Sequence, residues 1–171
     1  MCGFVGFVGK ESKEDKKKII KDMADMIVHR GPDSEGYFVD ERVALGFRRL
    51  SIIDLDKGNQ PIYNEDKSMV IVFNGEVYNY KEIKEELIKR GHKFKTNTDT
   101  EVILHGYEEY REELFNKLRG MFSFVIYDIK ENTLVGVRDP FGIKPFYYYK
   151  DDREFMFASE IKGMLVNPNF K

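Results

Sequence analysis

The sequence predicts an α+β fold in which strands and helices form separate layers. Short segments rich in Val, Ile, Phe and Tyr are mixed along the chain with three segments of helical period. The turn-forming residues Asp128–Asn132 join two of the strand-like segments as a hairpin. Strands paired in this way towards the C-terminal end favour an α+β fold over a doubly wound parallel one.

Six strands are predicted from their apolar, β-branched and aromatic residues. They are Cys2–Gly9, Tyr37–Phe47, Met69–Asn74, Met121–Asp128, Thr133–Val137 and Phe155–Ala158. The segment Met121–Tyr127 is apolar at nearly every position, which indicates burial on both of its faces. We therefore expect no solvent-facing side on this strand.

The first helix is predicted between the first two strands. Ser12 and Asp15 have the spacing of a capping box at its start. Its apolar face is predicted to hold Ile19, Ile20, Met23, Met26 and Ile27.

Two more helices are predicted between the third and fourth strands. Asn79 and Glu82 have the spacing expected at the start of the first, and Gly91 is expected to end it. Thr98 and Glu101 mark the start of the second. The predicted inward-facing residues are Ile83, Leu87 and Ile88 in the first, and Val102, Ile103, Tyr107, Tyr110, Leu114 and Leu118 in the second.

Composition places the chain among globular proteins and excludes several classes of function. Its 171 residues predict one domain over 1–171, and 42% hydrophobic residues exclude a disordered tail. No apolar run approaches the roughly 18 residues of a membrane span, so no membrane partner is expected. A formal net charge of −2 argues against a nucleic-acid partner. One cysteine and the lack of a secretory signal predict a cytoplasmic, reducing setting.

The sequence predicts no metal site. His29, His92 and His105 are scattered without the spacing of metal ligands, and a single cysteine cannot form a multi-thiolate site. Each histidine is interpreted as a surface or core imidazole. The glycines of the first strand match neither a dinucleotide-binding nor a phosphate-binding loop, so the motifs indicate no cofactor.

The position of Cys2 is the first sign of chemistry. An initiator Met is usually removed before a small residue, which would leave this cysteine at the N-terminus. Its thiol would then be the nucleophile and its own α-amine the base, as described for N-terminal threonine nucleophiles. In general, a thiol titrates at about 8.5 and an α-amine at about 7.7–8.0, so groups of these two kinds ionise close to neutral pH. Position alone favours the alternative that Cys2 is only a small residue of the first strand.

Other residues supply what such a nucleophile needs. Asn74 and Gly75 can donate an amide and a backbone N–H to a tetrahedral oxyanion, although Asn-Gly is also a frequent turn. Arg49 can bind an α-carboxylate through two hydrogen bonds, and Asp99 can accept from an α-ammonium. Alternatively, Arg49 is a surface arginine and Asp99 only supports a helix N-terminus.

Blocks of residues along nearly the whole chain resemble one family. They are Cys2–Gly6, His29–Asp33, Arg49–Asp54, Gln60-Pro61, Asn74–Asn79, Thr98–Glu101, Gly120–Phe124, Arg138–Pro145 and Ala158–Lys162. The chain resembles the N-terminal glutaminase domain of glutamine-dependent asparagine synthetases, which are class II glutamine amidotransferases among the N-terminal-nucleophile hydrolases. The blocks His29–Asp33 and Arg49–Asp54 resemble this branch more than the sister enzymes that form glucosamine-6-phosphate or phosphoribosylamine.

The resemblance implies a four-layer αββα sandwich of two antiparallel sheets. It also implies that Cys2 is the nucleophile and that Asn74 and Gly75 form the oxyanion hole. The implied glutamine site consists of Arg49, Leu50, Ser51, Ile52, Ile53, Asn74, Gly75, Glu76 and Asp99. Within it, Arg49 is expected on the carboxylate and Asp99 on the α-amine. The implied reaction hydrolyses the side-chain amide of L-glutamine through a thioester, giving glutamate and ammonia.

The resemblance further implies partners beyond L-glutamine. In the family, ammonia passes to a second domain, which uses ATP and Mg to convert aspartate to asparagine. We expect that synthetase domain to be absent from this chain, so no cofactor is expected here and the chain alone makes no asparagine. A homodimer is a further hypothesis.

Two features bear on activity, and two alternative functions stay open. Phe47 stands where the resemblance leads us to expect histidine, which we interpret as a packing change. If Met1 is retained, the amine base is blocked and the chain is expected to be inactive. The alternatives are a catalytically silent glutamine-sensing or docking domain, and a glutaminase domain that serves a different amidotransferase.

Overall fold

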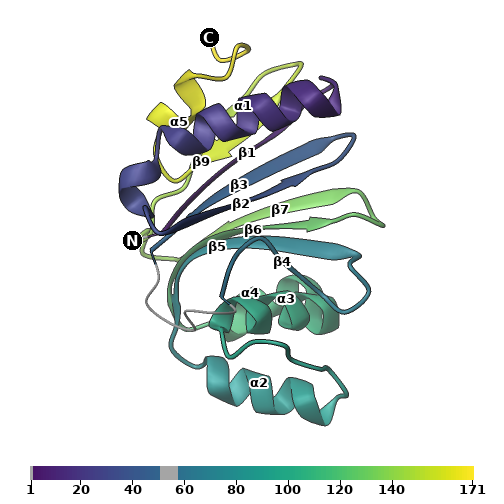
Figure 1. Cartoon of the computed structure of the whole chain (residues 1–171). Coiled ribbons are helices and arrows are strands. Elements are labelled where there is room, and N and C mark those ends of the chain that lie inside the picture. The colour runs from purple at the N-terminus through teal and green to yellow at the C-terminus, as the bar shows by residue number, and fades with distance from the viewer. Residues whose placement is uncertain (1, 51–57) are drawn as a thin grey trace.

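The computed structural model describes residues 2–50 and 58–171, and these form four layers (Figure 1). Two antiparallel sheets stack on each other, and helices cover the outer face of each sheet. The layers therefore run helix, sheet, sheet, helix. The predicted α+β class and the αββα sandwich are both confirmed.

The first sheet has five strands in the order β2-β3-β1-β9-β8. Their bounds are β1 (Gly3–Val8), β2 (Ser34–Val39), β3 (Val43–Arg49), β8 (Tyr147–Lys150) and β9 (Phe155–Ala158). Helices α1 (Lys13–Asp25) and α5 (Lys162–Leu165) lie on its outer face, and a 3₁₀ helix, η1 (Val28–Arg30), follows α1. The N-terminal strand β1 thus sits in the middle of the sheet, with a partner on each side.

The second sheet has four strands in the order β4-β5-β6-β7. Their bounds are β4 (Ile62–Tyr63), β5 (Met69–Val77), β6 (Gly120–Asp128) and β7 (Thr133–Arg138). On its outer side lie α2 (Tyr80–Lys89), α3 (Asp99–Tyr110), the 3₁₀ helix η2 (Arg111–Glu113) and α4 (Leu114–Lys117). The β6–β7 pair confirms the hairpin predicted at Asp128–Asn132.

Three apolar layers hold the sandwich together, and strand alternation explains them. Successive side chains of a strand point to opposite faces. In β1, Phe4 packs between the two sheets, whereas Val5 packs beneath α1. In β5, Val72 faces the other sheet and Ile71 faces the helices. Inner strands are therefore apolar on both faces, which is why their sequences are nearly continuous hydrophobic runs.

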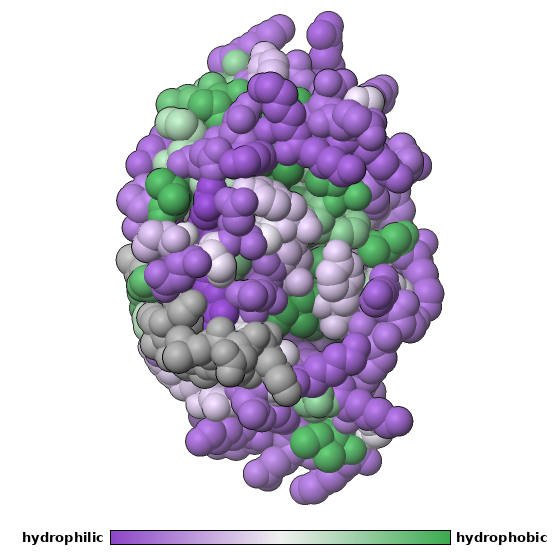
Figure 2. All heavy atoms as spheres, in the orientation of Figure 1, coloured by the Kyte–Doolittle hydropathy of each residue, from purple (hydrophilic) through white to green (hydrophobic). Residues whose placement is uncertain are grey.

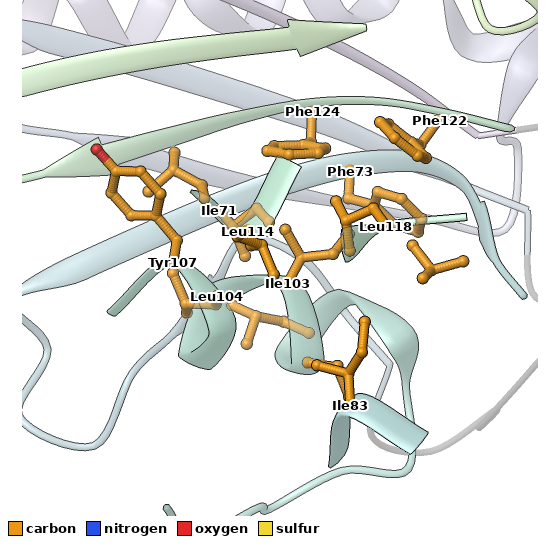
Figure 3. Packing of buried hydrophobic residues seen from close by; sticks show 14 of the residues in the cluster. Ile71, Phe73, Ile83, Ile103, Leu104, Tyr107, Leu114, Leu118, Phe122 and Phe124 are labelled. Atoms are coloured by element: carbon orange, nitrogen blue, oxygen red, sulfur yellow. The ribbon is translucent and has the colours of Figure 1, made fainter. Parts of the chain in front are cut away.

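Figure 3 shows the layer between the second sheet and its helices. Phe122 and Phe124 project from β6 towards Ile103, Leu114 and their neighbours. Figure 2 shows the surface of the molecule in the orientation of Figure 1. Most residues on this surface are hydrophilic, as expected when the apolar sides of helices and strands are buried. Within the described ranges, none of the helices combines the length and the apolar character needed to cross a membrane.

The strand predicted over Tyr37–Phe47 is wrong as a single element. The structure has two strands there, β2 and β3, joined by a tight turn at residues 40–42. The Asp40 carboxylate accepts hydrogen bonds from the backbone N–H groups of Arg42 (2.8 Å) and Val43 (2.7 Å). The polar triplet Asp40-Glu41-Arg42 is thus a side-chain-stabilised turn, which the apolar periodicity around it concealed.

The predicted helices exist, but four details differ. Met26 was predicted on the buried face of the first helix, but it lies just after α1 and is 38% exposed. The third helix ends at Tyr110, because the next residue, Arg111, has a φ of 50° in the left-handed region, and Leu114 begins the separate helix α4. Ile88 is 52% exposed because it lies about 100° around the helix from the buried Leu87. Asn79 makes no capping bond, since its amide bridges the Lys117 carbonyl and the Arg119 N–H instead.

The other helix signals are confirmed. Ser12 accepts from the backbone N–H of Asp15 at the start of α1, and Thr98 accepts from that of Glu101 at the start of α3. Gly91 follows α2 with a φ of 102°, a conformation that favours glycine.

The first prediction contrasts two fully buried serines. Ser159 accepts from the backbone N–H of Phe4 at 3.0 Å, whereas the Ser123 hydroxyl has no partner among the described residues. Ser159→Ala should lower the free energy of unfolding by about 1–3 kcal/mol, because it leaves a buried N–H unsatisfied. Ser123→Ala should be neutral or stabilising, because it removes an unpaired hydroxyl. Urea unfolding of both variants checks this, and equal losses would contradict it.

Candidate active site

The N-terminal end of β1 is held by hydrogen bonds from two distant segments. Ser159 binds both backbone groups of Phe4: its hydroxyl accepts from the N–H (3.0 Å) and its own N–H donates to the carbonyl (2.8 Å). The Arg30 Nε donates to the carbonyl oxygen of Cys2 at 3.0 Å. These contacts fix the residue that precedes β1, where chain ends ordinarily fray.

Arg30 is itself locked in place beneath the strand. Its Nη1 lies 3.0 Å from Glu160 Oε1, which also lies 3.0 Å from His29 Nε2. Burial opposes ionisation of Glu160, but hydrogen bonds and charge from Arg30 and His29 hold its pKa below the ordinary value. A side chain at Gly3 would come within 2.9 Å of Arg30 Cδ, so the glycine leaves room for the guanidinium to pass.

The thiol of Cys2 lies against the end of β3. Cys2 is half-buried and free, and its Sγ lies 3.4 Å from the backbone nitrogen and 3.5 Å from the carbonyl oxygen of Leu50. The thiol therefore lies within hydrogen-bonding distance of both backbone groups of Leu50.

A cavity of about 250 Å³ brings most of the predicted site residues together. Those that line it are Cys2, Arg49, Leu50, Asn74, Gly75, Glu76 and Asp99. Cys2 precedes β1, Arg49 and Leu50 lie at the end of β3, and the others belong to β5 and α3, so both sheets contribute. The predicted contacts of Ser51, Ile52 and Ile53 lie outside the described residues.

Asn74 presents an unused donor in this cavity. It is 2% exposed, and its Nδ2 has no hydrogen-bond partner in the part of the chain that the structure describes. Burying an amide N–H without an acceptor costs about 1–3 kcal/mol. An unpaired amide beside a thiol can donate a hydrogen bond to an acceptor atom of a bound ligand.

The turn interpretation of Asn74-Gly75 is wrong. Both residues lie within β5, where Asn74 pairs with Ser123 and Gly75 with Phe122. A side chain at Gly75 would come within 2.2 Å of the Met121 carbonyl oxygen, which explains the glycine by close strand approach. The strand continues to Val77 because its neighbour β6 runs beside it over the full length.

Gln60 positions this part of β5, although the sequence analysis did not predict it as a site residue. Its Oε1 accepts from the Phe73 N–H at 2.6 Å, and its Nε2 donates to the Phe73 carbonyl at 3.1 Å. The side-chain amide thus replaces a strand partner for the residue before Asn74. The available signal was the Gln60-Pro61 pair, which carries no information about distant pairing. Lys144 and Met121 also line the cavity, and neither was predicted there.

The two arginines that end β3 point to different surroundings. Arg49 is 5% exposed and lines the cavity, where its Nη1 donates to Asn59 Oδ1 at 2.8 Å. Arg48 pairs with Asp25 of α1 and, at 2.6 Å, with Glu35 of β2. Strand alternation therefore places Arg49 in the cavity and Arg48 against the outer helix. The surface interpretation of Arg49 is wrong.

Asp99 places in the same cavity a carboxyl group whose pKa is higher than usual. It is the first residue of α3, and its Oδ2 accepts from the Val77 N–H at 2.9 Å. Burial raises its pKa to about 6, with a smaller push from the charge of Glu76, and backbone hydrogen bonds oppose the rise. At neutral pH it is ionised and disposed to accept a cationic partner.

The histidines lie away from the cavity. His29 binds Glu160 under β1, whereas His92 and His105 have ring centroids 5.2 Å apart in a group with Glu65 and Glu108. None of these six residues lines the cavity. The sequence separation of His92 and His105 gave no indication that they would meet.

The fold and site define a class of protein. An αββα sandwich with a thiol just before its central strand, beside a buried amide donor, is suited to nucleophilic attack by that thiol. A model of the glutamine amidotransferase domain matches residues 1–171. The chain therefore belongs to the glutamine amidotransferase domain family.

Curated relatives agree on the branch. The chain is 53% identical over 172 residues to "Asparagine synthetase [glutamine-hydrolyzing] 1" of Bacillus subtilis (strain 168), covering 99% of this chain and 27% of that protein. It is 42% identical over 166 residues to the asparagine synthetase of Zea mays, covering 96% and 28%. The chain thus spans about a quarter of the length of these relatives and is homologous to their N-terminal part.

Solved structures agree on the fold. The glutamine phosphoribosylpyrophosphate amidotransferase of B. subtilis, complexed with ADP and GMP, superposes with a TM-score of 0.80 at 21% identity. The match covers 96% of this chain and 43% of that one. At this identity, the likeness concerns the fold alone.

The second prediction concerns the stability cost of Asp99. A carboxyl whose pKa is raised to about 6 in the folded state binds protons more tightly there than in the unfolded chain, so its ionisation destabilises the fold as pH rises from about 4 to 6. Asp99→Asn should therefore raise the free energy of unfolding at pH 8 by about 1–3 kcal/mol. The gain should shrink as pH approaches 4. Urea unfolding between pH 4 and 8 measures it, and a loss of stability at pH 8 would contradict the assignment.

Proposed function

We propose that this chain hydrolyses the side-chain amide of L-glutamine to glutamate and ammonia. The observation that carries the proposal is the buried Asn74 amide, which has no partner among the described residues and lines one cavity with the thiol of Cys2. The membership of the glutamine amidotransferase domain family supports the choice of substrate.

Cys2 carries out the covalent chemistry in this proposal. Once Met1 is removed, the free α-amine takes the thiol proton and Sγ attacks the side-chain amide carbon. The carbonyl oxygen becomes an oxyanion, which accepts from Asn74 Nδ2 and the Gly75 N–H. The α-ammonium of Cys2 then gives its proton to the leaving nitrogen, so ammonia departs and a γ-glutamyl thioester remains. Water, deprotonated by the same amine, hydrolyses the thioester and restores the thiol.

The α-carboxylate and the α-ammonium of glutamine would each face a side chain of opposite charge. Arg49 is proposed to bind the α-carboxylate, and Asp99, ionised above a pKa of about 6, accepts from the α-ammonium. Glu76 and Leu50 line the pocket beside them. Backbone contacts from Ser51–Ile53 remain part of the proposal, although these residues are outside the described ranges.

The relatives suggest where the ammonia goes. Because the matched proteins are glutamine-hydrolysing asparagine synthetases, we propose that it passes to an ATP-dependent synthetase domain that makes asparagine from aspartate. ATP and Mg would act only in that domain. The homodimer, the cytoplasmic setting and the lack of nucleic-acid and membrane partners stay predictions. A glutaminase that serves a different amidotransferase has less support, since the curated relatives reported above belong to one branch.

The third prediction tests the nucleophile and separates this proposal from a silent glutamine-sensing domain. After incubation with a glutamine-mimicking diazoketone, intact mass should show a chain that lacks Met1 and carries one adduct. Cys2→Ala should carry none and should release no glutamate from glutamine. A processed chain that binds glutamine but takes no adduct would favour the silent domain. If Met1 is retained, removing it enzymatically should restore labelling.

The fourth prediction tests the oxyanion donor. Asn74→Ala should lower kcat for glutamine hydrolysis about 10²–10³-fold and change KM little, because the oxyanion exists only in the transition state. The matched control is Asn116→Ala on the exposed side of α4, which should retain full kcat. Steady-state glutamate release measures both. A rise in KM at unchanged kcat would assign Asn74 to substrate binding instead.

A further inference from the structure

A group of four side chains outside the cavity has the make-up of a metal site. Glu65 follows β4, His92 follows α2, and His105 and Glu108 lie on α3. One ligand atom from each lies within 4.8 Å of all the others. Three segments that are distant in the sequence therefore converge on one point.

Three of the separations between ligand atoms are close to those of tetrahedral coordination, and all of them are within 4.8 Å. His105 Nδ1 lies 3.2 Å from Glu108 Oε2 and 3.3 Å from Glu65 Oε2. His92 Nδ1 lies 3.8 Å from Glu108 Oε2. Ligands about 2.0–2.1 Å from a tetrahedral metal are separated by roughly 3.3 Å. The wider separations, which reach up to 4.8 Å, would shorten when an ion binds.

Each carboxylate is anchored through one oxygen, which leaves the other directed to the centre. Glu65 Oε1 accepts from the Lys93 N–H at 3.1 Å, while its Oε2 faces His105. Glu108 Oε1 accepts from Asn64 Nδ2 at 3.2 Å, while its Oε2 faces both histidines. This division resembles a ligand shell that is oriented before the ion binds.

The second nitrogen of each imidazole faces another carboxylate, as is typical of metal-bound histidines. His92 Nε2 lies 3.2 Å from Glu109 Oε2. His105 is 1% exposed, and its Nε2 lacks a hydrogen-bond partner in the described parts of the chain, with Glu101 Oε1 3.6 Å away. Glu101 is itself fixed by the N–H groups of Lys95 and Thr96. A small rotation of His105 towards the centre would keep this outer contact.

The charge of the surroundings also favours a cation. Four carboxylates, from Glu65, Glu101, Glu108 and Glu109, surround the two imidazoles. Arg90 pairs with Glu109 at 2.8 Å, so negative charge is still in excess when both imidazoles are neutral. A divalent ion would offset this excess of negative charge.

We propose that Glu65, His92, His105 and Glu108 form a structural Zn²⁺ site. Two imidazoles and two carboxylates suit this ion, and four protein ligands leave no open position for catalysis. The ion would join the loop after β4, the segment after α2 and the helix α3. Asp99 begins α3, about 9 Å along the helix axis from His105. The site would therefore stabilise the helix that carries a cavity residue, without contacting the cavity.

The fifth prediction tests Zn²⁺ binding directly. Cys2→Ser removes the competing thiol, and this chain is dialysed against a chelator and titrated with ZnCl₂ by calorimetry. One equivalent should bind, and Tm should rise by roughly 5 °C or more at 100-fold excess over Kd. Co²⁺ should give the visible absorption of a tetrahedral site, and MgCl₂ should give no heat.

Variants decide whether the ion sits in this group. Glu65→Gln and His92→Gln, both in the Cys2→Ser chain, should each weaken Zn²⁺ binding at least tenfold. Glu65 is exposed, so its variant should fold, which circular dichroism checks. His29→Gln, outside the group, should bind normally. Absence of binding at millimolar ZnCl₂ would overturn the proposal in favour of a metal-free hydrogen-bonded cluster. Binding unchanged in both variants would also overturn it.

Discussion

The arrangement of the cavity depends on fixing the second residue of the chain. Chain ends are poorly ordered unless they are tied down. Here β1 pairs with β3 on one side and with β9 on the other, so the N-terminal strand is the centre of its sheet. Ser159 extends the pairing beyond β9 as far as Phe4, and Arg30 binds the carbonyl of Cys2. A thiol held in this way can meet donors from the opposite sheet with the accuracy that catalysis requires.

Polar groups inside the sandwich are of two kinds within the described ranges, satisfied and unsatisfied, and the second kind occurs at the cavity as well as at Ser123 and His105 elsewhere. Asp139 is buried, but its carboxylate accepts from four backbone N–H groups, and these lower its pKa against the effect of burial. Lys16 is also fully buried and donates to the carbonyls of Glu11 and Glu41. At the cavity, by contrast, Asn74 keeps an unsatisfied donor and Asp99 a raised pKa. Locally unfavourable groups at a site are expected where a ligand completes them.

Periodicity predicted most of the fold, and its errors have physical reasons. Most strands, the three main helices and the β6–β7 hairpin follow from apolar spacing, from the turn residues and from caps at Ser12 and Thr98. The β2–β3 turn was missed because one carboxylate, at Asp40, makes it. The strand β8 and the short helices α4 and α5 have few residues, so they carry little periodic signal. Strand order depends on contacts between distant segments, which no local pattern encodes.

The family resemblance predicted more residues of the site than reasoning from side-chain chemistry did. The reason is that the matched motifs contain two kinds of residue. Cys2, Asn74 and Asp99 offer reactive or charged groups that chemical reasoning can propose from residue type. Arg30 and Ser159 belong to motif blocks as well, yet they offer no chemistry to a substrate. Their contacts show that they hold the backbone of β1. The motif blocks therefore include residues that hold the site in place as well as its reactive groups. Contacts such as that of Gln60 with Phe73, where a side chain replaces a strand, emerge only when the sheets are assembled.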